Sequence, residues 1–241
     1  MTLRYSPRRA FRFRCLHIKP RDVPNHIKRP SYALSTILGD VDAQRDAEDK
    51  NGKIPLGGEA EQKLKSAAVL AKKVRDFAGS LVKSRHVFIP PSSRPLEDGD
   101  LVNVDVTVFL NGYHGDTSQT WLVGDVDLPG RLLCSITNEA LEAGISVCGP
   151  GQPFKNIGRA IHTIIEPQYQ SGHGIGSVFH RKPWILNHFK LILQPAIIQG
   201  RHPTSWIFPD GWTASTENCA RSAQAEHMVL ITEEGVEILT R

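Results

Sequence analysis

Apolar and polar residues alternate along residues 101–110, which is the pattern of a strand with one buried and one solvent-facing side. The residues sharing one face are Val102, Val104, Val106 and Val108, and those sharing the other are Asn103, Asp105, Thr107 and Phe109. Asn111-Gly112 follows, the strongest short signal for a two-residue hairpin turn, and residues 113–123 are expected to form the returning strand. The sequence therefore predicts an antiparallel hairpin in which Leu110 opposes Tyr113.

Two carboxylates share the polar face of this hairpin. In the predicted register Thr107 opposes Asp116, and Ser118 opposes Asp105. Diagonal neighbours on adjacent strands lie roughly 7–8 Å apart, within reach of a shared ligand. Two facing carboxylates repel unless they share a proton or a cation. The hairpin is therefore a candidate binding site, with an ordinary solvated face as the alternative.

Three stretches carry apolar residues at helical spacing, and the end of the chain is typical of strands. We predict helices within residues 59–82, 132–147 and 154–165. Residues 222–240 are expected to form two strands joined by a turn at Glu234-Gly235, whereas residues 184–213 show no clear period. A helix followed by an extended pair thus occurs early and, less regularly, late, which hints at an internal duplication.

Composition is ordinary for a soluble protein, with 40% hydrophobic and 22% charged residues among 241. No apolar run approaches the eighteen or so residues of a membrane span, so we expect no membrane association. The cysteines form no CxxC pair and predict neither a disulfide framework nor a zinc–thiolate site, which fits a reducing compartment. They are Cys15, Cys134, Cys148 and Cys219.

The net charge of +4 comes from the first 21 residues, which hold seven arginines and lysines and no acid; without these seven charges it becomes −3. An arginine-rich, acid-free segment containing Phe11, Phe13 and Leu16 is typical of a mitochondrial presequence. A basic arm for nucleic acid is the alternative. Because no basic patch continues into the body, we expect a mitochondrial location, with a cytoplasmic one as the alternative, and no nucleic-acid partner.

Further candidate site residues lie in the second half of the chain: His173, His180, His227 and Glu226. His173 stands between glycines, which leave its imidazole accessible, and Glu226 lies in the apolar segment AQAEHMVLI, where a carboxylate needs a partner or a metal ion. His114 and His162 are interpreted as structural. One histidine and several carboxylates suit a hard or borderline divalent cation, and bridging carboxylates favour a two-metal site.

Several motifs together resemble the type I methionine aminopeptidases, in particular their mitochondrial form. They are KRPSYAL, HGDTS after NVDVTV, GHGIG with FH, and SAQ-x-EH followed by LIT and GVEILT. The resemblance implies an α+β pita-bread fold, with a curved antiparallel sheet flanked by helices in two pseudo-symmetric halves. We therefore expect a targeting presequence at residues 1–21, an irregular lead-in at 22–58 and an aminopeptidase-like catalytic domain at 59–241.

The resemblance also implies roles for individual residues. Asp105, Asp116, His173 and Glu226 would bind two divalent ions (Co, Mn, Fe or Zn), with Asp116 and Glu226 bridging them. The implied reaction is removal of the initiator methionine from a nascent polypeptide by a metal-bound hydroxide, in an enzyme we expect to be monomeric. The residues implied in catalysis and substrate binding are His180, which would contact the peptide group, and Phe179 and Trp212, which would line the methionine pocket.

The chain departs from the family pattern at two places, so the predicted fold is incomplete. The family takes a fifth metal ligand from a glutamate in an F-T-I-E-P strand, but this chain has no acid between His188 and Asp210. We do not assign that role to Glu166, which precedes GHGIG. A second segment is missing after Val82, and His86 is two residues out of register with a pocket histidine of the family. The alternative to an active enzyme is a catalytically impaired or inactive pita-bread domain, from a splice variant or an incomplete gene model.

Overall fold

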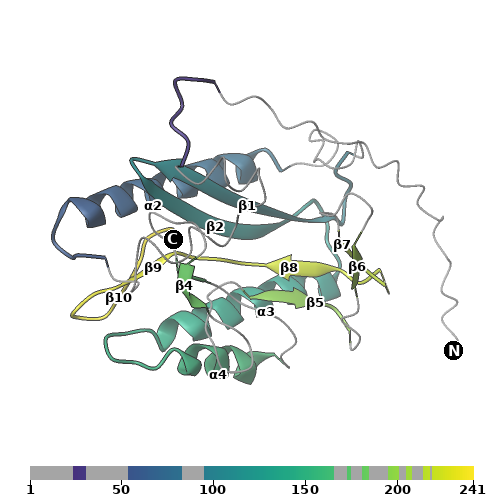
Figure 1. Ribbon diagram of the computed structural model, residues 1–241. Helices are drawn as coiled ribbons and strands as arrows, with labels where there is room; N and C mark the ends of the chain where they lie inside the picture. Colours follow the sequence, from purple (N-terminus) through teal and green to yellow (C-terminus); the bar gives the residue numbers. More distant parts are fainter. Residues whose placement is uncertain are drawn as a thin grey trace, which may run out of the picture.

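The protein is represented by a computed structural model in which helices flank antiparallel strands (Figure 1). The structure describes residues 24–30, 54–82, 95–165, 173–174, 181–184, 195–200, 205–207, 214–217 and 219–241. Its helices are α2 (Glu59–Ser80), α3 (Leu128–Ser146) and α4 (Lys155–Ile164). Its strands are β1 (Leu101–Leu110), β2 (Tyr113–Leu122), β3 (His173–Gly174), β4 (Arg181–Trp184), β5 (Ala196–Ile198), β6 (Ser205–Ile207), β7 (Ala214–Thr216), β8 (Ser222–Gln224), β9 (Val229–Ile231) and β10 (Val236–Ile238).

The predicted hairpin is confirmed as β1 and β2, in the predicted register. Leu110 pairs with Tyr113 across the turn. Asn111 and Gly112 have φ angles of 53° and 87°, and two successive positive φ values define the turn that matches the twist of a two-residue hairpin. Ten consecutive residue pairs follow without a bulge, so the faces assigned from the alternation are maintained along both strands.

Helix α2 packs closely on one face of the hairpin. Ala67, Ala68 and Ala71 are buried along the helix and present little side-chain bulk. Opposite them lies Gly115 of β2, where an added Cβ would come within 2.2 Å of the Ala67 carbonyl oxygen. Because neither element has a large side chain here, the helix and strand backbones approach closely. This contact occupies the hairpin face opposite Asp116.

Helices α3 and α4 cover the C-terminal strands in a second packing unit. Asp127 begins α3, because its carboxylate accepts a hydrogen bond from Gly130 N at 2.9 Å, and Pro129 lies in the first turn. This cap places the helix start at Leu128, four residues before the predicted apolar stripe. The buried cluster between the helices and strands comprises Ala140, Leu141, Ile145, Ile157, Ile161 and Ala225.

The two units join along β2 and the chain that follows β8. Figure 1 shows the hairpin and β8 between α2 on one side and α3 with α4 on the other. Ser118 and Glu226 form an antiparallel bridge, with N···O distances of 3.4 and 3.0 Å. Ala223 and Ala225 pack toward α3 and α4, as Gly115 packs toward α2. The helices therefore pack against the faces of β2 and of the chain after β8 that are opposite Asp116 and Glu226.

The C-terminal prediction is confirmed in outline and corrected in detail. Strands β9 and β10 pair antiparallel across Thr232–Gly235, where Thr232 N donates to Gly235 O at 2.9 Å. The single strand expected before that turn is instead two strands: β8 pairs with β5, and β9 pairs with β10. Between β8 and β9 the chain turns away from β5, and Glu226 forms a bridge with Ser118 of β2.

Strands β3 to β7 were not predicted, and three of them lie in, or directly after, the stretch without a clear period. These three are β5, which pairs with β8, and β6 and β7, which pair with each other. Each has three residues, too few for an alternation to be recognised. No helix in the described ranges is long and apolar enough to cross a membrane.

Candidate metal centre

The centre begins with a row of residues that crosses three antiparallel segments. Asp105 of β1 pairs with Ser118 of β2, and Ser118 bridges to Glu226. Paired residues of an antiparallel ladder project to the same face. The middle position of the row is a serine, so the carboxylates on either side of it are separated only by a small side chain.

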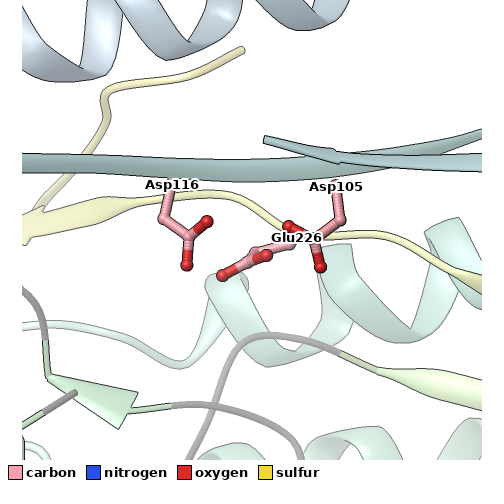
Figure 2. A group of neighbouring side chains, drawn as sticks. All are labelled: Asp105, Asp116 and Glu226. Atoms are coloured by element: carbon pink, nitrogen blue, oxygen red, sulfur yellow. The ribbon is translucent and has the colours of Figure 1, made fainter. Parts of the chain in front are cut away.

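Asp116 completes the centre from the next position on the same face of β2. Figure 2 shows its carboxylate on the same side of the hairpin as those of Asp105 and Glu226. One carboxylate oxygen of each residue lies within 4.8 Å of the other two. The predicted convergence of Asp105 and Asp116 is therefore confirmed, and Glu226 joins them.

These oxygens suit a divalent cation in chemistry and spacing. Carboxylates bind ions such as Zn²⁺ at about 2.0–2.2 Å, so ligand oxygens on opposite sides of one ion lie about 4–4.5 Å apart. Asp116 is 3% exposed and Glu226 is 7% exposed, whereas Asp105 is exposed. Burying clustered carboxylates is unfavourable unless their charge is compensated. The donor set and the burial therefore both fit a bound cation.

Neighbouring polar side chains orient the carboxylates. Thr107, opposite Asp116, donates from its hydroxyl to Asp116 Oδ1 at 3.0 Å. Gln224 donates from Nε2 to Asp105 Oδ2 at 2.9 Å. Hydrogen bonds of this kind restrict the rotation of a carboxylate side chain.

The backbone of Glu226 is tied to the helix behind the hairpin. Thr117 donates its hydroxyl proton to Glu226 O at 2.9 Å and accepts a hydrogen bond from Arg75 Nη1 at 2.7 Å. Arg75 is 4% exposed and also pairs with Asp76 at 2.9 Å. A chain of polar contacts thus runs from α2 through β2 to Glu226 and helps fix its position.

His227, next to Glu226, is a neutral structural residue near pH 7. Burial, followed by the positive charge of Arg75, lowers its pKa to about 4. Its Nδ1 lies 3.1 Å from the hydroxyl of the buried Thr240. Its ring is thus engaged with the C-terminal segment. His114, interpreted from the sequence as structural, is buried and packs on Phe109 with ring centroids 4.8 Å apart.

The remaining predicted site residues are only partly covered by the structure. His173 lies in β3, which pairs with β4, but its side chain is outside the described part. His180, Phe179 and Trp212 fall outside the described residues altogether. Their assigned roles remain predictions.

No role was predicted for Gln224 or Thr107. The signals for both were present: Gln224 is two residues before Glu226, which places it on the same side of an extended chain, and the register sets Thr107 opposite Asp116. The sequence did not show, however, that β8 lies beside the hairpin.

Comparisons with known proteins place the chain among metallopeptidases. The model of metallopeptidase family M24 matches residues 58–233. Methionine aminopeptidase 1D, chloroplastic/mitochondrial, of Arabidopsis thaliana is 35% identical over 290 aligned positions, covering 95% of this chain and 80% of that protein. Methionine aminopeptidase 1D, mitochondrial, of Mus musculus is 34% identical over 276 positions, covering 91% and 80% respectively.

The alignment with the Arabidopsis protein also bears on the predicted internal gaps. Its 290 positions exceed the 241 residues of this chain by 49. The relative therefore has residues at 49 or more aligned positions where this chain has none. This agrees with the prediction that internal segments of the family pattern are missing.

Solved structures identify the fold. The crystal structure of methionine aminopeptidase from Rickettsia prowazekii superposes with a TM-score of 0.69 at 31% identity, covering 78% of this chain and all of that one. This likeness confirms the predicted α+β pita-bread fold, whose family uses divalent metal ions. The chain belongs to metallopeptidase family M24, within its type I methionine aminopeptidases.

Proposed function

We propose that this chain is a metalloaminopeptidase that removes the N-terminal initiator methionine from newly made polypeptides. The observation that carries the proposal is the convergence of the Asp105, Asp116 and Glu226 carboxylates to within 4.8 Å. They lie inside the span matched by a metallopeptidase family, in a chain whose relatives are named methionine aminopeptidases.

The carboxylates and His173 would hold two divalent ions, with Asp116 and Glu226 shared between them. When bound, the ions would act as Lewis acids that polarise the scissile carbonyl and lower the pKa of the attacking water. A set of carboxylates and one histidine suits Co, Mn, Fe or Zn. Because no acid lies between His188 and Asp210, we expect one of the two positions to bind its ion more weakly.

Substrate recognition would come from residues around the centre. His180 would donate a hydrogen bond to the peptide carbonyl and stabilise the negative charge that develops on its oxygen. Phe179 and Trp212 would line the pocket for the methionine side chain. The sequence motifs in which these three residues lie support these roles.

The proposed place of action is the mitochondrion. Relatives from Arabidopsis thaliana and Mus musculus carry that location in their names. The first 21 residues, rich in arginine and free of acids, support a targeting role for this segment. The substrates would then be polypeptides made or delivered there with a free N-terminal methionine, processed by a monomeric enzyme.

Release of methionine from a short peptide tests the activity. Purified protein supplied with Mn²⁺ or Co²⁺ should hydrolyse Met-Ala-Ser, lose that activity in EDTA and regain it when metal is restored. N-acetyl-Met-Ala-Ser should not be cleaved, because its α-amino group is blocked. A folded protein, verified by circular dichroism, that releases no methionine with any of the four metals would instead support the impaired or inactive domain.

A further inference from the structure

We propose that Gln224 is a positioning residue that presets the exposed metal ligand Asp105, an inference that rests on the proposed metal centre. Its side-chain Nε2 lies 2.9 Å from Asp105 Oδ2 and 3.2 Å from Ser118 Oγ. An amide nitrogen carries two protons, so it can serve both acceptors at once. Gln224 thereby links β8 to both strands of the hairpin.

The need for a positioning group is greatest at Asp105. Asp116 and Glu226 are buried, so packing restricts their side chains, whereas Asp105 is exposed. An exposed aspartate loses rotational freedom when it binds an ion, and this loss reduces affinity. A hydrogen bond that holds one carboxylate oxygen beforehand lowers that entropic penalty.

Gln224 is itself held by a second pair of polar residues, Asn103 and Thr120. They face each other across the hairpin on the same side as Asp105. The Thr120 hydroxyl accepts from Gln224 N at 3.0 Å and donates to Gln224 O at 2.8 Å. Asn103 Nδ2 donates to the same carbonyl at 2.9 Å and to Thr120 Oγ1 at 3.1 Å. Thr120 thus donates once and accepts twice, the full capacity of a hydroxyl group.

This second pair makes the role of the Gln224 side chain separable from that of its backbone. The contacts with Thr120 and Asn103 use only the main-chain N–H and C=O of Gln224. Replacing the side chain by a methyl group leaves these backbone groups in place. β8 should therefore remain beside the hairpin while Asp105 loses its amide donor.

The chemistry of the side chain is also specific. A carboxylate only accepts hydrogen bonds, so Asp105 requires a donor at this position, and the amide nitrogen provides one without adding charge. A glutamate of the same length would have no such donor at neutral pH and would place another negative charge beside Asp105. Glutamine therefore orients the ligand without adding to the repulsion within the centre.

Titration of metal-free protein with Mn²⁺ by calorimetry tests the inference. We expect Gln224→Ala to raise the dissociation constant of the tighter ion about 10–100-fold, the usual effect of removing a group that orients a metal ligand. The thermal midpoint of the metal-free variant should stay close to that of the wild type. Gln119→Ala is the matched control, because Gln119 lies on β2 but on the opposite face of the hairpin.

The outcomes separate this inference from the proposed function. If the wild type binds no Mn²⁺, the metal centre itself is wrong. If the wild type binds Mn²⁺ and Gln224→Ala binds it equally well, the centre stands and the positioning role is wrong. A fall in affinity matched by Gln119→Ala, or accompanied by an equal loss of metal-free stability, would show a general structural effect and would also overturn the inference.

Discussion

Replacing Asp116 by asparagine should abolish metal binding and aminopeptidase activity while leaving the metal-free protein as stable as the wild type or more so. Asparagine has nearly the same shape, and its amide oxygen can still accept the hydrogen bond from Thr107. It removes, however, the charge that we propose is shared between two ions. Loss of an orienting neighbour typically lowers metal affinity or activity about 10–100-fold, so loss of a ligand should lower both at least about 100-fold.

The stability effect has the opposite sign because of the charges that surround Asp116. Its carboxylate oxygen lies within 4.8 Å of those of Asp105 and Glu226. Two ionised carboxylates about 5 Å apart repel by roughly 3 kcal/mol at an effective dielectric constant near 20. Removing one charge relieves part of this repulsion in the metal-free protein. Added Mn²⁺ should therefore raise the unfolding temperature of the wild type but not that of Asp116→Asn.

Asp125→Asn is the matched control. Asp125 lies just after the end of β2, and its side chain is 93% exposed. It should bind Mn²⁺ and cleave peptide like the wild type. Retention of metal-stimulated stabilisation by Asp116→Asn would rule out the assigned role. A large drop in its metal-free stability would indicate that Asp116 is mainly structural.

Replacing Gly115 by alanine should reduce the free energy of unfolding by about 3 kcal/mol or more. The added Cβ would lie 2.2 Å from the Ala67 carbonyl oxygen, 2.5 Å from its carbonyl carbon and 3.0 Å from Ala68 N. All three are backbone atoms of α2, which cannot turn aside as a side chain can. The helix and hairpin must therefore separate, exposing the buried alanines between them. Urea denaturation of the metal-free protein measures the loss.

Gly58→Ala is the control for this substitution. Gly58 immediately precedes α2, has φ of −120° and has no atom within 4 Å of an added Cβ. Its replacement should change stability little. If Gly115→Ala unfolds at the same urea concentration as Gly58→Ala, the close approach of α2 to β2 is incorrect. Gly115→Ala should also weaken Mn²⁺ binding, because Gly115 directly precedes Asp116.

The hairpin and the helices were predictable because their signals are local and long. Ten alternating residues and an Asn-Gly turn determine both the register and the face of β1. The three helices each carry an apolar stripe over ten or more residues. Strands β5, β6 and β7 have three residues each, too few to show a local pattern, and β5 pairs with β8 rather than with a strand next to it in the sequence.

The candidate site was likewise predictable only where its signal is local. Asp105 and Asp116 follow from the register of one hairpin, whereas Glu226 lies more than a hundred positions away and was linked to them only through a family motif. Its burial indicated that it needs a partner without identifying which. The contact from Gln224 to Asp105 spans 119 positions and depends on the placement of β8 beside the hairpin. No local pattern contains that information.

Anomalous X-ray diffraction from crystals of the protein grown with Mn²⁺ tests the metal centre most directly. We predict anomalous density between Asp105, Asp116 and Glu226, at about 2.2 Å from a carboxylate oxygen of each residue. A second, weaker peak is expected beside Asp116 and Glu226, at the ion that we propose His173 also binds. Well-ordered carboxylates with no anomalous density between them, at a Mn²⁺ concentration that supports peptide hydrolysis, would contradict the account.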